Sequence, residues 1–176
     1  MGKNKISTKT IQYSVYDRTN GGASYIGDTV TYTRPDIEMQ TDGFSGAGIM
    51  GELDLPTLGQ LASMEGELAF NKTTEKMVDL FSPQAHTIEV RWVTNVINTA
   101  TGNIEVQANK EIVKFLPKTI SLGDIEGNET NESSMTYEIL AYQYIIDGAS
   151  VMKVDKLNNV FMVGDTDYSA RIRNLL

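Results

Sequence analysis

The sequence predicts a mainly β protein of one domain with a single α-helix near the middle of the chain. Short runs rich in β-branched and aromatic residues recur along the chain, and Gly, Asn and Asp residues of the kind that form turns separate them. Only one segment has a helical pattern. The 176 residues suffice for one buried core, and no repeat or linker divides them. We therefore expect residues 1–176 to form a single domain.

The N-terminal part of the chain is predicted to form a β-hairpin with a long loop. Residues 11–16 and 28–34 are the two expected strands, because both are rich in β-branched and aromatic side chains. Residues 20–22 read Asn-Gly-Gly and supply turn chemistry, since they adopt positive φ at low cost. Pro35 ends the second strand, because proline cannot donate a hydrogen bond to a neighbouring strand.

Residues 37–70 predict short strands around a flexible loop. Residues 37–40 are an expected strand, and the glycine-rich residues 43–48 are an expected loop. This loop lacks the Gly-Lys-Ser/Thr ending of a phosphate-binding loop. Residues 60–70 alternate apolar and polar side chains as a half-buried strand does, with Glu65 and Glu67 on the polar side.

The one predicted helix follows Thr73 or Thr74, either of which can cap its N-terminus. Its apolar side chains form one stripe, and Pro83 ends the helix. The stripe consists of Met77, Val78, Leu80 and Phe81.

Residues 87–98 and 104–116 predict two long strands that a polar turn at 98–103 joins. The second strand has one apolar and one polar face. The apolar face consists of Ile104, Val106, Ala108 and Ile112. The polar face consists of Glu105, Gln107, Asn109 and Glu111. This alternation predicts a sheet with its apolar face in the core and its polar face in water.

The last third of the chain predicts an acidic loop, two more strands and a short terminal element. Residues 118–134 are the loop, and residues 135–146 are apolar on both faces, as in a buried strand. Asp147-Gly148 predicts a tight turn before the partner strand 151–157. We expect residues 165–176 to form a short helix or an extended C-terminal arm. Asp165 and Thr166 are the candidate N-caps of such a helix.

Residue patterns that carry chemistry are nearly absent. The chain has no cysteine, which excludes disulfides, thiolate metal sites and cysteine nucleophiles. His86 is the only histidine and lacks the partners of a catalytic triad or metal site, so we interpret it as an ordinary surface residue. Trp92 is expected in the core. We assign no catalytic, cofactor-binding or metal-binding residue, and weak ion binding by the acidic residues of 124–132 is the alternative left open.

Three pairs of carboxylates also fail to indicate an enzyme. They are Asp36 with Glu38, Glu52 with Asp54, and Glu65 with Glu67. Acid–base hydrolysis needs two carboxylates that face each other across a substrate. Residues two apart on a strand point to the same side, so a solvated face is the better interpretation.

The charge and hydropathy of the chain restrict its partners. A net charge of −8 disfavours stable binding to nucleic acid, because phosphate neutralisation requires Lys and Arg. The simplest interpretation of this negative charge is that it keeps the protein soluble. A more specific interpretation is that the protein forms the wall of a channel along which DNA slides without binding. No apolar run is long enough for a membrane anchor or a secretion signal.

The C-terminal third carries four motifs in a recognisable order. They are residues 137–148, which end in Asp-Gly, residues 151–158 with Val-Asp and a final Asn, the Gly-x-Asp segment 163–168, and the arginine-containing tail 171–176. This order resembles the major tail tube protein family of contractile-tailed phages and phage-tail-like bacteriocins. Earlier strands, turns and the helix follow the family order, so the resemblance extends over almost the whole chain. Residues 72–102 and 118–134 agree with the family in their architecture but not in their amino acids.

The resemblance implies a β-barrel or sandwich with one flanking α-helix and extended loops and termini. It also implies a structural protein without a cofactor, and not an enzyme. Subunits of this family form hexameric rings that stack into a hollow tube inside a contractile sheath, and contraction drives the tube through the target envelope. The expected partners are other copies of the chain, the sheath, baseplate and tail terminator proteins, and DNA in transit only. The expected location is a virion tail or bacteriocin particle that assembles in the host bacterial cytoplasm.

Two sets of residues are predicted to act in such an assembly. The lumen is expected to be lined by Glu65, Glu67, Glu105, Gln107, Asn109 and Glu111. Contacts between rings are expected from residues 43–54 and both termini, because flexible segments can order on assembly. The residues expected there are Gly43, Phe44, Gly46, Gly48, Glu52, Arg171 and Arg173.

Three other functions are compatible with parts of the pattern. A tube subunit of a type VI-like secretion system is a close relative of the first hypothesis. A β-sandwich that binds carbohydrate or protein belongs to a different class, and a hydrolase would need a constellation that the sequence does not contain. The choice between a phage and a DNA-free bacteriocin, the target host and the strands that line the lumen stay open.

Overall fold

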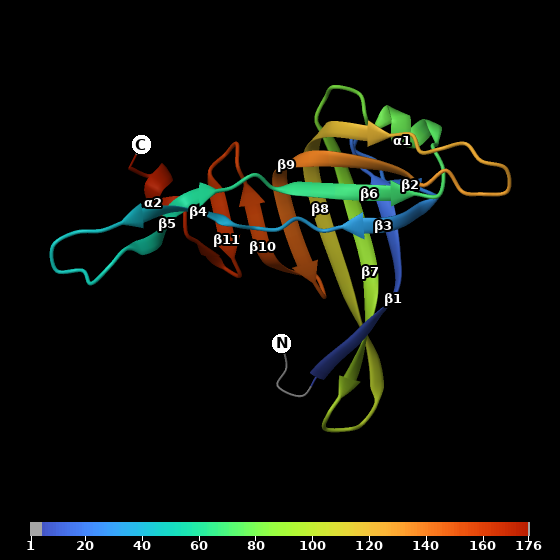
Figure 1. The fold of residues 1–176 in the computed structure, drawn as a ribbon. Coiled ribbons are helices and arrows are strands. Elements are labelled where there is room, and N and C mark those ends of the chain that lie inside the picture. Colours follow the sequence, from blue (N-terminus) through green and yellow to red (C-terminus); the bar gives the residue numbers. More distant parts are fainter. Residues whose placement is uncertain (1–4, 176) are drawn as a thin grey trace.

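The computed structural model describes residues 5–175 and contains twelve strands and two short helices (Figure 1). The elements are β1 (Lys5–Asp17), β2 (Ser24–Ile26), β3 (Thr29–Thr33), β4 (Met39–Phe44), β5 (Leu53–Leu61), β6 (Glu65–Phe70), α1 (Glu75–Asp79), β7 (His86–Asn98), β8 (Ile104–Ser121), β9 (Ser133–Ile146), β10 (Ala149–Asp155), β11 (Val160–Val163), β12 (Thr166–Asp167) and α2 (Ala170–Arg173). The predicted mainly β fold class is confirmed, and α2 adds a second short helix.

Ten of the strands form one antiparallel sheet that bends over itself. Its long path runs β12-β11-β10-β9-β8-β7-β1-β2. The second half of β9 pairs with β10, whereas its first half pairs with β6, which pairs in turn with β3. We call β1, β2, β7, β8, β10, β11, β12 and the second half of β9 the main sheet, and β3 and β6 the cross layer. Figure 1 shows the cross layer running at a steep angle to β7 and β8.

The hydrophobic core lies between the main sheet and the cross layer. Val15 and Val113 of the main sheet and Leu68 of the cross layer are fully buried. The rings of Phe115 and Tyr137 contact each other with centroids 4.3 Å apart. Burying an apolar side chain of this size contributes about 1.5–3 kcal/mol. We call the face of the main sheet that lines this core the inner face, and the opposite one the outer face.

Helix α1 flanks one end of this core and is shorter than the predicted stripe. Thr74 caps it as predicted, since its hydroxyl accepts a hydrogen bond from the backbone N–H of Met77 at 3.3 Å. Met77 and Leu80 are buried, but half of Val78 is exposed. The helix therefore contributes a narrow apolar edge to the core instead of a full face.

The predicted N-terminal hairpin is wrong in its pairing. β1 pairs with β2 and β7, whereas β3 pairs with β6 in the cross layer. The chain leaves the main sheet between Ile26, which is fully buried, and Asp28, whose φ is 61°. This sharp change of direction moves β3 into the other layer.

Three further expectations need correction. Residues 60–70 form the end of β5 and all of β6, with a break at residues 62–64, where Met64 is fully buried. The terminal helix is not capped by Asp165 or Thr166. Thr166 begins β12 instead, and α2 follows Ser169, whose side chain makes no capping hydrogen bond. The long strands predicted as 87–98, 104–116 and 135–146 are confirmed as β7, β8 and β9. The predicted loop 118–134 is too long, because β8 continues to Ser121 and β9 begins at Ser133.

Candidate assembly surfaces

The hairpin of β7 and β8 has its polar and apolar faces the other way round from the prediction. Asn109 and Glu111 are buried on the inner face, whereas Ile104 and Val106 are on the outer face and are 71% and 67% exposed. Alternation along a strand separates two faces, but it does not determine which of them meets another layer. The expected arrangement, with the apolar face in the core and the polar face in water, is therefore wrong.

Glu111 is the centre of a buried polar network that joins the two layers. The Tyr32 hydroxyl donates to its Oε2 at 2.7 Å, and the Tyr142 hydroxyl donates to its Oε1 at 2.5 Å. Nε of Arg34 donates to Oε1 at 2.7 Å, and its Nη2 completes an ion pair. Burial, together with the charge of Glu111, raises the pKa of both tyrosines above the usual value, so their hydroxyls stay protonated donors.

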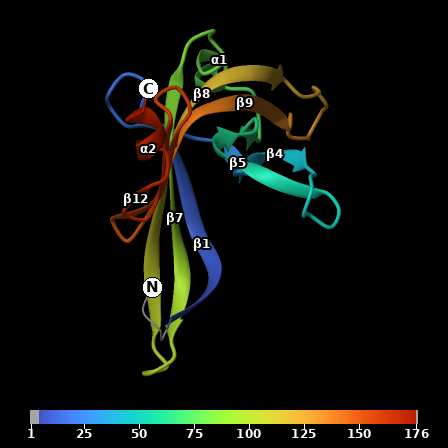
Figure 2. The ribbon, with the colours of Figure 1, turned by 90° about the vertical axis from the view of Figure 1, so that its left-hand side faces the viewer.

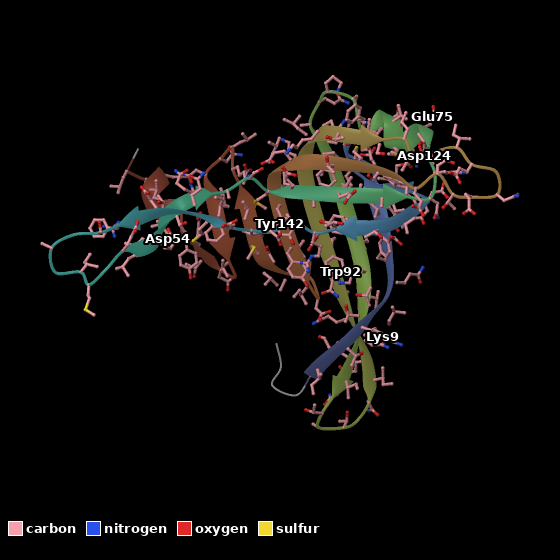
Figure 3. All side chains as sticks on the ribbon, viewed as in Figure 1. Lys9, Asp54, Glu75, Trp92, Asp124 and Tyr142 are labelled. Atoms are coloured by element: carbon pink, nitrogen blue, oxygen red, sulfur yellow. The ribbon has the colours of Figure 1, made fainter. Side chains whose placement is uncertain are left out.

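Two aromatic rings hold the Arg34 guanidinium in place. Its Cζ lies 4.8 Å from the ring centroid of Tyr144 and 5.3 Å from that of Trp92. The two rings are nearly parallel, with centroids 5.6 Å apart. Trp92 (Figure 3) is partly buried and packs against the core, in line with its predicted place. Because Arg34 directly follows β3, this contact fixes the edge of the cross layer to the main sheet.

Two of the six residues predicted to line the lumen, which we call the lumen set, are instead part of the buried network. Asn109 accepts a hydrogen bond from Tyr144 at 3.2 Å and donates one to Thr94 at 3.1 Å, and Glu111 is fully buried. Both are engaged inside the subunit, so neither lies on a surface that could face a lumen. Sequence reasoning missed Tyr32, Arg34 and Tyr142, because no local pattern indicates partners so far away in the chain.

The other four residues of the lumen set are not brought together. Glu65 and Glu67 are on β6, and Glu65 forms an ion pair with Lys118. Glu105 lies near the free end of the β7–β8 hairpin, where it pairs with Lys5 at 2.6 Å (Figure 1). Gln107 is on the same strand as Glu105 and is partly buried. A lumen role for these four residues stays a prediction.

Residues 39–61 form a two-stranded hairpin that projects from the body of the protein, and we call it the arm (Figure 1). Its register pairs Asp42 with Leu55 and Phe44 with Leu53, so these four side chains share one face. Phe44, Leu53 and Leu55 are each about half exposed. An isolated two-stranded hairpin is only marginally stable, so such a face is suited to packing against another surface.

The residues predicted for ring contacts fall into two groups. Five of them lie in the arm, namely Gly43, Phe44, Gly46, Gly48 and Glu52. The other two lie in α2 near the base of the arm, where a Cβ on Gly59 would lie 2.9 Å from the Ile172 side chain. Arg173 is engaged within the subunit, since it donates to the Asn159 carbonyl at 2.6 Å and pairs with Asp167 at 2.5 Å. Arg171 is exposed.

The contact role of these seven residues stays a prediction. The first four residues of the chain belong to the predicted N-terminal contact and lie outside the described part.

Both ends of the main sheet present open strand edges. β2 pairs only with residues 15–17 of β1, so residues 5–14 have no neighbouring strand on that side among residues 5–175. At the other end of the sheet the last strand is β12, which has two residues. Open edges carry backbone groups that can pair with another chain.

His86 is buried, so its interpretation as an ordinary surface residue is wrong. Its Nε2 lies 3.0 Å from the Ser82 hydroxyl, and its Nδ1 lies 3.4 Å from the Thr19 hydroxyl. The ring also lies against Phe115. These contacts join the turn after β1 to the segment after α1, which is a structural role.

Within residues 5–175, no cluster of three or more His, Cys, Asp or Glu side chains is placed to hold a metal ion. The helices of this part are also too short and too polar to cross a membrane.

A family model described as phage tail tube protein FII matches residues 15–176. The chain belongs to this family. The resemblance to tail tube proteins is thereby confirmed, and the family is one of structural proteins. No curated protein matches the sequence significantly.

Two solved structures share the fold of this tail tube protein. One is the sheath/tube terminator of the extracellular contractile injection system PVC in the extended state. Its TM-score is 0.50 at 16% identity, over 80% of this chain and 96% of that chain. The other is the PVC sheath–tube complex in the extended state. Its TM-score is 0.50 at 16% identity, over 78% of this chain and 88% of that chain. At this identity the likeness shows the fold.

Proposed function

We propose that this tail tube protein assembles into hexameric rings that stack into a hollow tube inside a contractile sheath. The tube would be driven through a target envelope on contraction and would conduct DNA or ions, without catalysis. Its partners would be further copies of itself and the sheath, baseplate and tail terminator proteins. Assembly would take place in the cytoplasm of a host bacterium. The observation that carries this proposal is the exposed arm with an apolar face that the subunit itself leaves uncovered.

The open edges of the main sheet support closure into a ring. The edge of β1 in one copy and the β11–β12 edge in another are different surfaces, so a contact between them is head-to-tail. Head-to-tail contacts close into rings when the rotation between neighbours allows it. Ring closure would also remove the exposed edges that make an isolated sheet prone to aggregation.

The charge of the chain supports a conduit more than a nucleic-acid binder. The net charge of −8 opposes lasting contact with DNA phosphates. DNA in transit would therefore encounter a protein to which it binds weakly. The same charge would also favour the passage of cations.

Negative-stain electron microscopy of the purified full chain tests this proposal. We expect rings or tubes at high protein concentration. A variant that lacks residues 43–50 should lose the tubes, because it lacks the tip of the arm, and yet keep the circular dichroism spectrum of the wild type. Deletion of residues 125–129, in the exposed loop before β9, is the matched control and should leave assembly intact.

Two results would contradict the proposal. One is a monomer at every concentration, with or without sheath protein. The other is a 43–50 deletion that forms tubes of unchanged length and yield.

A further inference from the structure

The arm has no strand pairing with the rest of the protein. β4 and β5 form a separate two-stranded sheet, and among residues 5–175 neither strand pairs with the main sheet or the cross layer. Figure 2 shows the arm standing to one side of β1 and β7. Because no ladder of backbone hydrogen bonds joins the arm to the body, its direction depends on the contacts at its base.

The chain on the body side of the arm is firmly held. The Ala62 N–H donates to the Glu38 carbonyl at 2.9 Å, which closes the base of the hairpin. Glu138 of β9 accepts a hydrogen bond from the Ser63 hydroxyl at 2.6 Å and pairs with Lys156 at 3.0 Å. These contacts fix the point from which the arm starts.

β5 contains a large bulge directly beyond this point. Between two successive pairs of the register, residues 57–60 of β5 face the single residue Gln40 of β4, and we call residues 57–60 the bulge. An insertion of this kind interrupts the ladder and bends the strand. Gly59 within the bulge has a φ of 77°, which glycine adopts at low cost. The bulge is therefore the place where the arm can change direction.

Helix α2 lies against this bulge. The Ile172 side chain is so close to Gly59 that a Cβ there would lie 2.9 Å from its Cδ1. α2 follows β12, the last strand of the main sheet. Arg173 holds α2 to the turn between β10 and β11, because it donates to the Asn159 carbonyl at 2.6 Å, and it also pairs with Asp167. α2 thus connects the main sheet to the bulge (Figure 1).

The attachment of α2 is weak enough to open. No residue of α2 is fully buried. A recess of about 140 Å³ lies between the bulge, the β10–β11 turn and Ser169. Ser169 is 1% exposed, but its hydroxyl has no hydrogen-bond partner among residues 5–175. An unpaired buried hydroxyl destabilises the closed arrangement, and an element with few buried apolar contacts opens at a low cost in free energy.

We propose that α2 is a latch that holds the arm in one direction, and that the arm pivots at the bulge when the latch opens. The closed latch is the arrangement of this structure. In the open state α2 leaves Gly59, and the arm keeps its own strand pairing while its direction varies. An arm of fixed direction loses less conformational entropy on contact with another molecule. The latch goes beyond the proposed function, since it controls a single subunit before any assembly.

Distances between two spin labels test the latch in single subunits. The labels are attached to Ala47→Cys at the tip of the arm and Lys114→Cys on β8, which are exposed positions. The chain contains no cysteine, so the labels attach nowhere else. Below the concentration at which subunits assemble, electron paramagnetic resonance should give one narrow distance distribution. The latch variant, Ile172→Ala with Arg173→Ala, should broaden this distribution about twofold or more, because the arm then samples many directions.

Arg171→Ala is the matched control for the latch variant. It removes a positive charge from the same helix, but Arg171 is exposed, so the distance distribution should stay unchanged. Circular dichroism verifies that every variant is folded.

A second pair of variants opens the latch from the side of the bulge. Gly59→Ala places a methyl group against Ile172 and should broaden the distribution, whereas Gly102→Ala should not. Both glycines have a positive φ, 77° and 74°, so the backbone strain is matched. A Cβ at Gly102 would meet nothing within 4 Å.

The latch should also affect assembly. The latch variant should need an about threefold or higher protein concentration to form rings or tubes, because each arm must first be ordered. Arg171→Ala should assemble like the wild type. Equal concentrations for the latch variant and the wild type would overturn the control of assembly by α2.

The outcomes separate this inference from the proposed function. An unchanged distance distribution in the latch variant would overturn the inference, and so would a broad distribution in the wild type. Equal broadening by Arg171→Ala would assign the effect to charge and overturn it as well. The tube function stands in all three cases. If no ring or tube forms at all, the proposed function fails, and the distances in single subunits still decide on the latch.

Discussion

At the scale of single residues, one buried carboxylate connects the two layers of the fold. Glu111 is fully buried and receives hydrogen bonds from Tyr32, Arg34 and Tyr142. A buried ion pair need not stabilise a protein more than an apolar pair would, but loss of one partner leaves an uncompensated charge. Glu111 therefore makes the native state depend on groups that come from both layers.

Arg34→Ala should lower the free energy of unfolding by about 3 kcal/mol, because Glu111 would lose its cation inside the protein. Lys118→Ala is the matched control. It breaks the exposed pair with Glu65, and such pairs contribute about 1 kcal/mol or less. Urea denaturation followed by far-ultraviolet circular dichroism measures both changes. Equal effects of the two substitutions would show that the Arg34 contact does not stabilise the fold.

At the scale of elements, the cross layer can approach β9 closely because one of its residues has no side chain. Gly66 of β6 pairs directly with Tyr137 of β9. A Cβ at Gly66 would lie 2.6 Å from the Tyr137 ring, which is fully buried and packs against Phe115. The glycine thus allows an aromatic ring to lie across the cross layer.

Gly66→Ala should lower stability by about 1–3 kcal/mol, because the added methyl group overpacks the site and displaces the Tyr137 ring. Gly46→Ala is a suitable control, since a Cβ there would meet nothing within 4 Å. Thermal unfolding of the two variants beside the wild type checks this prediction. An unchanged melting temperature for Gly66→Ala would mean that the ring moves aside freely.

At the scale of the whole molecule, the main sheet and the cross layer share one core. The second half of β9 belongs to the main sheet and its first half pairs with β6 of the cross layer, and the core contains side chains from both parts. We therefore propose that residues 1–176 are one domain. The arm and the free end of the β7–β8 hairpin extend from this domain and carry most of the surfaces proposed for assembly.

A single domain should unfold in one cooperative transition. Trp92 is the only tryptophan and lies on the main sheet, so its fluorescence reports on that layer. Far-ultraviolet circular dichroism reports on all strands. The two signals should give the same urea midpoint under conditions that keep the chain monomeric. Two separate midpoints would instead divide the chain into independent units.

The sequence by itself determined the local elements and the family. Long strands such as β7, β8 and β9 were predictable because their side-chain pattern and their turns are local properties. The tight turn before β10 is an example, since Asp147 and Gly148 both have the positive φ that such turns require. The order of these elements was also sufficient for the resemblance to tail tube proteins. The loop predicted at residues 43–48 was predictable for the same local reason, although β4 extends through Phe44.

The tertiary structure alone decided which side of each strand meets the core. Asn109 and Glu111 lie inside, while Ile104 and Val106 of the same strand lie outside. The Glu111 partners Arg34 and Tyr142 are 77 and 31 residues away in the chain. Burial of a polar face requires the donors of another layer, and the pattern of one strand contains no information about those donors.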